Sequence, residues 1–384
     1  MWNAVAMGTT IGALGVFVQP IQHEFGWTSE QIGRPLTAFV LAMTAILPAV
    51  GLLIGKVGAR IVMACGAVLV CLGYGLASGS RALPVLVFAL ATSGVGLGAS
   101  AYLPCTVVIS EWFSGRRGLA LGMLLAASAI GATAFPILIA PLVLHLGWRQ
   151  VMAGIGLLNL VVGLPIIATL AIHGPYRNED HSAATGVELP LRRLMQLPVF
   201  RLVTLVLILS QLSFYGIYFH LIPFLTSRGF PETTAVLFYS GSSLATFVGS
   251  MILGPLIDRC GAKPVLVAAL SVLVLSSLLL PFIHPGVAGV TAGIVFALFW
   301  GSVVNSPLQF APILLADAVG VARFGTLLGI SNFLTGLISS SGPLLTGAIH
   351  DATHGYVEAF LLSTCIAALA LVPALLLLRQ RPPE

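Results

Sequence analysis

The chain has 384 residues, of which 58% are hydrophobic and 8% are charged, and its mean hydropathy is +1.05. Because a soluble domain carries roughly 25% charged residues, this composition excludes a soluble enzyme, a disordered chain and a secreted disulfide-rich protein. Apolar runs longer than about 18 residues predict membrane-spanning helices instead of barrel strands.

Twelve apolar runs follow one another along the chain, separated by short polar breaks. The predicted spans are residues 2–21, 31–54, 60–79, 84–109, 118–144, 149–172, 199–226, 232–256, 263–283, 287–312, 323–348 and 355–378. One longer polar stretch, residues 173–198, interrupts the series. It predicts a cytoplasmic linker between an N-terminal six-helix bundle (1–172) and a C-terminal one (199–384), with no soluble domain.

Lys and Arg residues concentrate in alternate gaps between the spans. With a cytoplasmic N-terminus, thirteen of the 17 lie on the cytoplasmic side, and only Arg34, Arg81, Arg149 and Arg228 lie on the other. This positive-inside bias predicts that both termini are cytoplasmic. We therefore expect a multi-pass protein of the plasma membrane, which in a bacterium is the inner membrane. The net charge of +5 reflects this orientation and not nucleic-acid binding.

The two halves of the chain repeat each other. Residues 51–60 read GLLIGKVGAR and residues 254–263 read GPLIDRCGAK, an offset of 203 that also pairs Gly26-Trp27 with Gly229-Phe230. Glu111 and Arg117 similarly lie 206 residues before Asp317 and Arg323. The sequence therefore predicts a duplicated six-helix unit. Two such units enclosing a site at the membrane midplane are typical of an alternating-access carrier.

These loops resemble a motif of the major facilitator superfamily, roughly GxLxDRxGxK/R. The second copy matches it through Gly254, Asp258, Arg259, Gly261 and Lys263. The first copy keeps Gly51, Lys56, Gly58 and Arg60, but has Gly55 where the family usually has Asp. The resemblance implies the major facilitator fold, an all-α integral membrane protein with twelve transmembrane helices in two pseudo-symmetric six-helix bundles.

Two further stretches resemble the monocarboxylate and oxalate/formate transporter branch of that superfamily. They are GVFVQPIQHEFGWTSEQIG near the start and YLPCTVVISEWFSGRRGLALG around the fourth and fifth spans. The acidic start that some members show in the first helix is missing here. Relatives that carry organic anions often place an Arg in the eighth helix, and this chain has no cation there.

The loop motif implies a gating network at the cytoplasmic ends of the helices. Its glycines suit tight turns. Its charges can lock the gate if an Asp at the end of one helix, such as Asp258, pairs with basic side chains across the same half. The alternative is that these charges are positive-inside anchors facing water. The gating candidates are Gly51, Lys56, Gly58, Arg60, Glu111, Arg117, Gly254, Asp258, Arg259, Gly261, Lys263, Asp317 and Arg323.

Uncharged polar residues are the candidates for substrate binding, because no Asp, Glu, Lys or Arg lies at the middle of a predicted span. Gln211, Tyr215 and Tyr218 share one helical face. In the superfamily, helices one, four, seven and ten line the cavity, which adds Tyr102, Asn305 and Gln309, and Asn332 follows from helix eleven. The alternative is that such residues only join helices, although burying an amide without a partner costs a few kcal/mol. His220, on another face, is a candidate for proton coupling or a structural histidine.

These observations predict a secondary carrier, active or facilitative, for a small organic solute. A monocarboxylate is the leading class, H⁺ is a candidate coupling ion, and the bilayer is the surrounding partner. No phosphate-binding loop spacing occurs, and the five Cys lack metal-site spacing, so we expect no ATP hydrolysis, no enzyme activity, no cofactor and no metal. Each chain holds both halves of a pathway, so a monomer should function. The alternatives are an efflux carrier for neutral or amphipathic compounds and, in another class, a transport-inactive membrane sensor.

Overall fold

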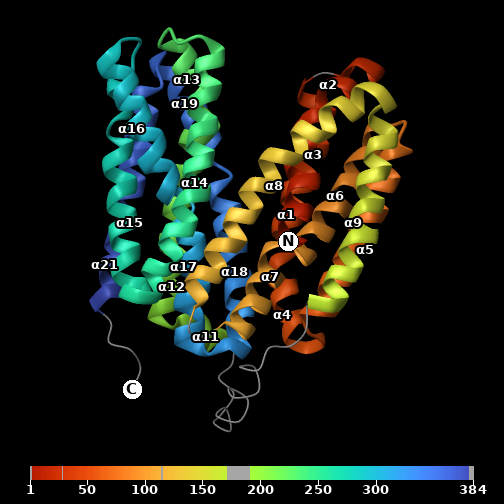
Figure 1. Cartoon of the computed structure of the whole chain (residues 1–384), viewed down its shortest axis with the longest axis horizontal. Coiled ribbons are helices and arrows are strands. Elements are labelled where there is room, and N and C mark those ends of the chain that lie inside the picture. The colour runs from red at the N-terminus through yellow and green to blue at the C-terminus, as the bar shows by residue number, and fades with distance from the viewer. Residues whose placement is uncertain (1, 28, 114–115, 171–190, 380–384) are drawn as a thin grey trace. The chain divides into compact units, whose positions relative to one another are not determined.

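The computed structural model describes residues 2–27, 29–113, 116–170 and 191–379. The described residues form helices and no strand, which confirms the predicted all-α class (Figure 1). Of the predicted linker 173–198, the part up to residue 190 lies outside the described residues, and Leu191–Gln196 forms the short helix α11.

The chain packs as two units. Unit 1 comprises Met1–Ser114, Ala127–Gly186 and Val321–Phe333, and unit 2 comprises Gly115–Ala126, Val187–Gly320 and Leu334–Glu384. Two long helices therefore belong to both units. The start of α8 (Arg117–Leu146) packs in unit 2, and the start of α18 (Val321–Ser339) packs in unit 1. Each unit contains the first turns of a helix from the other half of the sequence.

Unit 1 is built on closely packed helices with small residues at their contacts. A Cβ placed on Gly73 would lie 2.6 Å from the backbone nitrogen of Ser93, so α5 and α6 approach more closely than larger side chains would allow. Besides the shared helices, its elements are α1 (Trp2–Met7), the π-helix η1 (Gly8–Gly12), α2 (Leu14–Phe25), α3 (Ser29–Ala45), α4 (Leu47–Val57), α5 (Ala59–Ser78), α6 (Leu83–Ser100), α7 (Tyr102–Trp112) and α9 (Trp148–Leu170).

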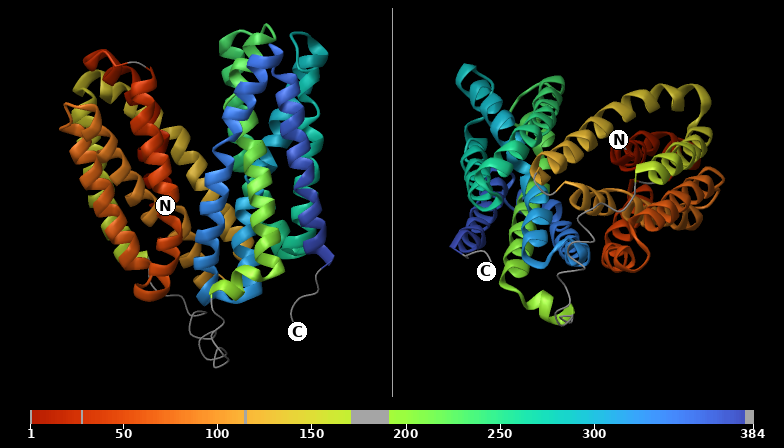
Figure 2. Two further views of the ribbon diagram at one scale, coloured as in Figure 1. Left: turned by 180° about the vertical axis from the view of Figure 1, so that it is seen from behind. Right: turned by 60° about the horizontal axis from the view of Figure 1, so that its bottom comes forward.

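Unit 2 repeats this plan. A Cβ on Gly249 in α14 would overlap the Cα of Ser302 in α16, so here too two backbones lie close together. The views from behind and from below show α21 beside α15, in agreement with their packing (Figure 2). After α11, its elements are α12 (Pro198–Tyr218), α13 (Leu221–Ser227), α14 (Glu232–Cys260), α15 (Ala262–Ser277), η2 (Leu280–Phe282), α16 (Val287–Val304), α17 (Ser306–Val319), α19 (Gly342–Thr353), α20 (Val357–Leu369) and α21 (Leu371–Arg379).

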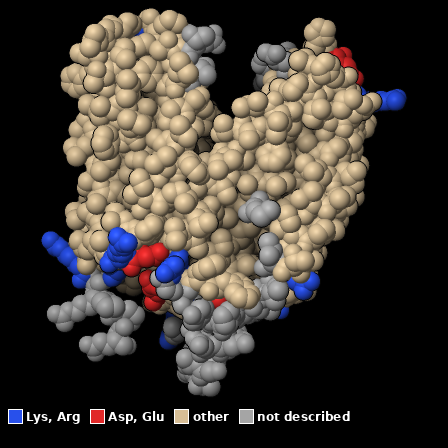
Figure 3. All heavy atoms as spheres, in the orientation of Figure 1, with Lys and Arg blue, Asp and Glu red and all other residues tan. Residues whose placement is uncertain are grey.

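Among the described residues, nine helices are long and apolar enough to cross a membrane, and α3 with α4 makes a tenth span bent by 42°. The other two of the twelve predicted spans coincide with interrupted helices. Span 2–21 contains the π-helix η1 between α1 and α2, and span 323–348 is broken between α18 and α19. On the face drawn in space-filling form, charged side chains gather at helix ends and the long sides are uncharged (Figure 3), as a membrane-spanning chain requires.

Candidate functional site

Two mid-span breaks place Tyr102 and Asn305 at equivalent points of the repeat. α6 ends and α7 begins around Ala101, while α16 and α17 meet at Asn305. Pro104 and Pro307 follow these breaks at the repeat offset of 203. Because proline has no N–H and cannot continue the helical bonding, Pro104 and Pro307 cannot bond the carbonyls of Ser100 and Val303, which accept from the Trp2 indole and the Asn305 backbone N–H instead. Interrupted helices of this kind form solute sites in carriers.

A network of polar side chains in unit 1 includes one hydrogen bond at the break. The indole Nε1 of Trp2 donates to the carbonyl of Ser100 at 2.7 Å, which is the carbonyl that Pro104 cannot bond. The amide of Asn3 donates to the Ser128 hydroxyl at 2.5 Å. The amide of Asn159 donates to the Thr9 hydroxyl, within the π-helix, at 2.9 Å.

Sequence analysis missed this network, although an Asn within an apolar run was a usable signal. Asn3 and Asn159 are buried, and among the described residues their Oδ1 atoms have no hydrogen-bond partner. Two amide oxygens are therefore left to accept hydrogen bonds. π-Helical segments such as η1 are frequent at functional sites.

An aromatic cluster in unit 2 contains the predicted stripe of α12. Phe214 and Tyr218 have ring centroids 4.8 Å apart, and Tyr218 lies 4.8 Å from Tyr239 of α14. Phe214 also stacks on Trp300 of α16 at 5.9 Å. The structure thus brings Tyr218 and its neighbours on α12 together with rings from two other helices.

Two polar atoms at this cluster are buried without a hydrogen-bond partner among the described residues, Gln211 Oε1 and Trp300 Nε1. Gln211 lies one turn before Phe214 and Tyr215 on α12. The pair offers one acceptor and one donor in apolar surroundings, where an unpaired polar group costs a few kcal/mol. Trp300 was missed because nothing in an apolar run distinguishes a packing Trp from a binding one.

The remaining substrate candidates lie elsewhere. The amide of Gln309 donates to the carbonyl of Gly118 at 2.9 Å and approaches that of Ser250 at 3.5 Å. Gln309 therefore joins α17 to the start of α8 and to α14. Asn332 is half-buried on α18, in the part that packs with unit 1. His220 lies between α12 and α13 and contacts Tyr356.

Asp258 caps the start of α8. Its two carboxylate oxygens accept from the backbone N–H groups of Gly118 at 2.8 Å and Leu119 at 3.0 Å. These donors have no partner within their own helix, and the helix dipole makes that end positive. The contact is tight because a Cβ on Gly254 would lie 2.6 Å from the Cα of Leu119. We call this contact of α8 with α14 the capped junction.

The sequence motif suggested that Asp258 would pair with basic side chains, whereas its observed partner is a helix end. The basic side chain nearby, Arg117, pairs instead with Asp317 at 3.4 Å. Arg259 is exposed. The first turn of α8 is therefore contacted by two carboxylates. Asp258 accepts from its backbone N–H groups, and Asp317 pairs with the guanidinium group of Arg117.

Unit 1 contains the equivalent contact without an acid, and we call it the uncapped junction. A Cβ on Gly51 of α4 would lie 2.7 Å from the carbonyl oxygen of Gly325 in α18, and the Thr326 hydroxyl donates to the Gly51 carbonyl at 3.1 Å. Gly55, one turn later, has open space where a side chain would extend. The following turns match: Gly58 and Gly261 have φ of 84° and 85°, values that favour glycine.

The other gating candidates differ in exposure. Lys56 and Arg60 are exposed, Lys263 is half-buried, and Glu111 is buried at the end of α7. The side chain of Arg323 lies outside the described residues.

A charged cluster that sequence analysis did not predict ties three helices of unit 1. Arg149 of α9 donates to the carboxylate of Glu24 at 2.8 Å and to the carbonyls of Ser78 and Ser80 at 2.8 and 2.7 Å. The indole of Trp148 donates to the other Glu24 oxygen at 2.6 Å. Hydrogen bonds from Arg149 and Trp148 hold the pKa of Glu24 below its ordinary value of 4.5.

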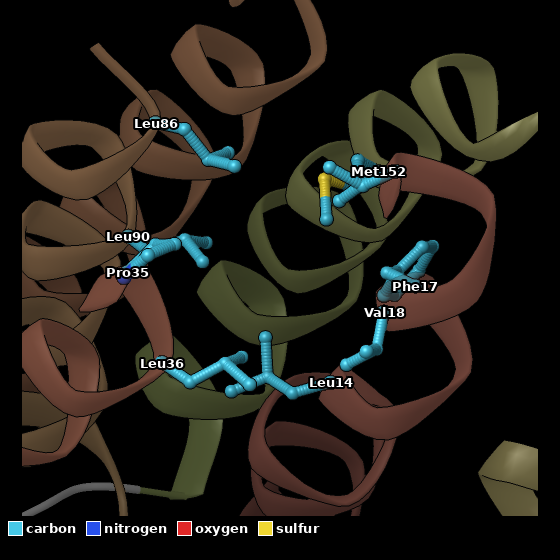
Figure 4. A pocket seen from close by; sticks show the side chains of 9 residues that line it. Leu14, Phe17, Val18, Pro35, Leu36, Leu86, Leu90 and Met152 are labelled. Atoms are coloured by element: carbon cyan, nitrogen blue, oxygen red, sulfur yellow. The ribbon is translucent and has the colours of Figure 1, made fainter. Parts of the chain in front are cut away.

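Two cavities in the described residues are apolar. One, of about 10 Å³, lies among α2, α3, α6 and α9 between side chains such as Leu14, Phe17 and Met152 (Figure 4). It is at the lower limit for one water molecule and is a packing gap. The other, a groove of about 290 Å³ between α14 and α16, is lined in part by Leu237, Ile294 and Leu298. These side chains are exposed, so the groove faces the lipid.

Comparison with known proteins places these features in one family. The family model of the Major Facilitator Superfamily matches residues 1–312 and 240–384. Monocarboxylate transporter 13 of Rattus norvegicus is 28% identical over 311 residues, covering 80% of this chain and 71% of the relative. A probable L-galactonate transporter of Escherichia coli is 26% identical over 409 residues, covering 96% and 85%.

Solved structures agree on the fold. The fucose:proton symporter FucP of E. coli aligns with a TM-score of 0.75 at 16% identity, over 99% of this chain and 98% of that one. XylE aligns with a TM-score of 0.79 at 13% identity, over 100% and 95%. With its interrupted spans, its repeated junctions and a family match across both halves, the chain belongs to the Major Facilitator Superfamily and is a multi-pass membrane transporter of a small molecule, not an enzyme.

Proposed function

We propose that the protein is a secondary carrier for a small monocarboxylate, moved by alternating access. The observation that carries the proposal is the pair of unsatisfied polar atoms at the aromatic cluster of unit 2, Gln211 Oε1 and Trp300 Nε1. A hydroxylated carboxylate would accept from the indole and donate to the amide. Relatives named as monocarboxylate and L-galactonate transporters support this substrate class.

Substrate would reach this cluster and the break at Tyr102 in turn, and the two junctions would act as the gate. Asp258 holds the start of α8 in the capped junction, and Gly51 forms the close contact of the uncapped one. The positive-inside bias supports cytoplasmic termini in a plasma membrane. Proton coupling is part of the proposal, and a structural neighbour is a fucose:proton symporter.

Uptake by purified protein in proteoliposomes tests the substrate class. Radiolabelled lactate, pyruvate and L-galactonate are offered with and without an inward-acid pH jump. Saturable uptake of at least one acid, reduced severalfold by Trp300→Phe, is the expected result, because the variant keeps the ring but loses the N–H donor. Phe296→Leu, on a ring that stacks on Trp300 at 5.3 Å, is the control for lost packing alone.

Efflux of a neutral or amphipathic compound is the second candidate, favoured because the aromatic cluster is built from uncharged side chains. If no acid is taken up while a neutral amphipathic dye is expelled from loaded vesicles, this reading replaces the first.

A further inference from the structure

A cluster of two imidazoles and one phenol lies at the end of unit 2 that carries α13 and α19, opposite the C-terminus (Figure 1). His350, in the last turn of α19, stacks on Tyr356 with ring centroids 4.1 Å apart and an interplanar angle of 29°. His220 lies against the same phenol at 5.7 Å and 45°. The three residues come from three separate segments, and His220 and His350 are far apart in the sequence.

The surroundings of this cluster contain both charged and apolar groups. Asp351 of α19 lies 3.2 Å from Nδ1 of His350, so a protonated His350 forms an ion pair with it. Further carboxylate and guanidinium groups come from Glu358 at the start of α20 and from Arg228 after α13, whose guanidinium lies 5.4 Å over the Phe224 ring. Phe224 and Phe360 close the apolar side of Tyr356.

His220 occupies a break in the helix. α12 ends at Tyr218, α13 starts at Leu221, and the N–H of His220 bonds to the Ile217 carbonyl instead of continuing the α-helical pattern. Its Nδ1 is buried without a hydrogen-bond partner among the described residues. Below the break, α12 and α19 are held together, since a Cβ on Gly342 would lie 2.7 Å from the Leu212 carbonyl. The segment that can respond to a charge on His220 is therefore α13.

Two imidazolium ions at one phenol repel each other, because like charges nearby disfavour the charged form of both. One imidazolium is favoured, since a cation near the face of Tyr is attracted by the ring. We propose that His220 and His350 share a single proton across Tyr356, and that this is the site of the coupling ion. The proposal rests on the proposed function, and it adds the ion, its two ligands and the helix break that responds to it.

Proton binding can be measured without any substrate. Histidine side chains are labelled with ¹⁵N and titrated by NMR in lipid nanodiscs, for the wild type and for His350→Gln. Loss of the second imidazole should raise the titration midpoint of His220 by roughly half a unit to two units. His284→Gln is the matched control, because this histidine is also in unit 2 but is exposed in the link before α16. A His220 midpoint that is the same in all three proteins would overturn the shared site.

Transport supplies the second arm. The double variant His220→Gln/His350→Gln should lose at least tenfold of the pH-driven accumulation while keeping substrate exchange at equal pH, and Tyr356→Leu should lose part of it where Tyr356→Phe does not. Full pH-driven accumulation in the double variant would refute the coupling role. If no acid is transported at all, the proposed function fails, and the NMR titration still decides the proton site.

Discussion

Replacing Asp258 with Asn tests whether the capped junction controls transport. The carboxylate accepts two backbone N–H groups, from Gly118 at 2.8 Å and Leu119 at 3.0 Å. Asn is nearly the same size but uncharged, and only one of its two terminal atoms is an acceptor. The substitution therefore removes one hydrogen bond and the charge that faces the positive end of α8.

The magnitude follows from these two losses. A hydrogen bond to a charged group contributes about 1.5–3 kcal/mol, and a charge at a helix N-terminus about 0.3–1 kcal/mol. Because Asp258 is exposed, solvent and salt screen both contributions, and we expect a net loss of about 1 kcal/mol. That corresponds to a roughly fivefold smaller equilibrium ratio of capped to open junction, and so to a roughly fivefold larger open fraction when the capped state dominates.

Cysteine labelling measures this population. Ser250 is buried, and its carbonyl lies directly against Gly122 of α8, so Ser250→Cys reports on whether the start of α8 is in place. Cys65, Cys260 and Cys365, which are exposed, are first replaced by Ala. In this background Asp258→Asn should increase the labelling rate about fivefold, and less so in 1 M salt.

Transport and binding should respond differently. Turnover should fall with Asp258→Asn, while the affinity for substrate changes by less than twofold, because Asp258 touches α8 and not the aromatic cluster. Arg259→Gln removes the neighbouring exposed charge without touching the cap, and serves as the control. Equal labelling in the two variants, or unchanged turnover with Asp258→Asn, would refute the gating role of the cap.

Three further variants test the other contacts. Gly55→Asp should supply the missing acid in open space and shift the balance between inward- and outward-open forms, read by cysteine accessibility at both faces. Gly254→Ala should lower the thermal midpoint by several degrees, whereas Gly241→Ala, in the same helix but in open space, should leave it unchanged or raise it. The low pKa of Glu24 means that its ion pair with Arg149 stabilises unit 1 above pH 4.5 and is lost as the pH falls through the lowered value. In Glu24→Gln the midpoint temperature of thermal unfolding should therefore fall less steeply as the pH is lowered below 4.5 than it does in the wild type.

Each of these expectations has a contrary result. Identical accessibility in wild type and Gly55→Asp would show that the uncapped junction is insensitive to charge. Equal thermal midpoints for Gly254→Ala and Gly241→Ala would mean that α14 and α8 do not need their close approach. If the thermal midpoint falls equally steeply at low pH in Glu24→Gln and in the wild type, another group causes the acid sensitivity.

The repeat made much of the fold predictable from sequence. Gly51 and Gly254 were expected at tight helix contacts because they recur at an offset of 203, and in the structure each lies against the backbone of a helix from the other half, Gly51 against Gly325 and Gly254 against Leu119. Hydrophobic length identified the spans, since a helix must be long enough to cross the bilayer. The interruptions in the first and eleventh spans were not predicted, because an apolar run looks the same whether or not its backbone bonds are continuous.

The partners of polar side chains were the part that sequence could not supply. The sequence predicted an ion pair for Asp258, but its observed donors are backbone N–H groups of Gly118 and Leu119. Every residue except proline has such a group, so the sequence does not show which of them lies near a given carboxylate. Gln309 shares the helical spacing of a binding stripe, yet its amide joins the junction at Gly118. His220 could be judged alone in the sequence, whereas its neighbour His350 is brought to it only by the packing of α19 against α12.

The difference between the two junctions bears on how such a carrier can work. Each unit contains the start of a helix from the other half, so in the proposed alternating access both junctions would have to loosen. A cap that contributes about 1 kcal/mol can break in thermal motion. It still shifts the equilibrium between the capped and the open junction about fivefold toward the capped state. With Asp258 on one junction and Gly55 on the other, the bias acts on one half of the duplicated structure only. Under the proposed gating role no strong ion pair would be needed: close glycine contacts would set the geometry of both junctions, and a single carboxylate would set which state the resting protein prefers.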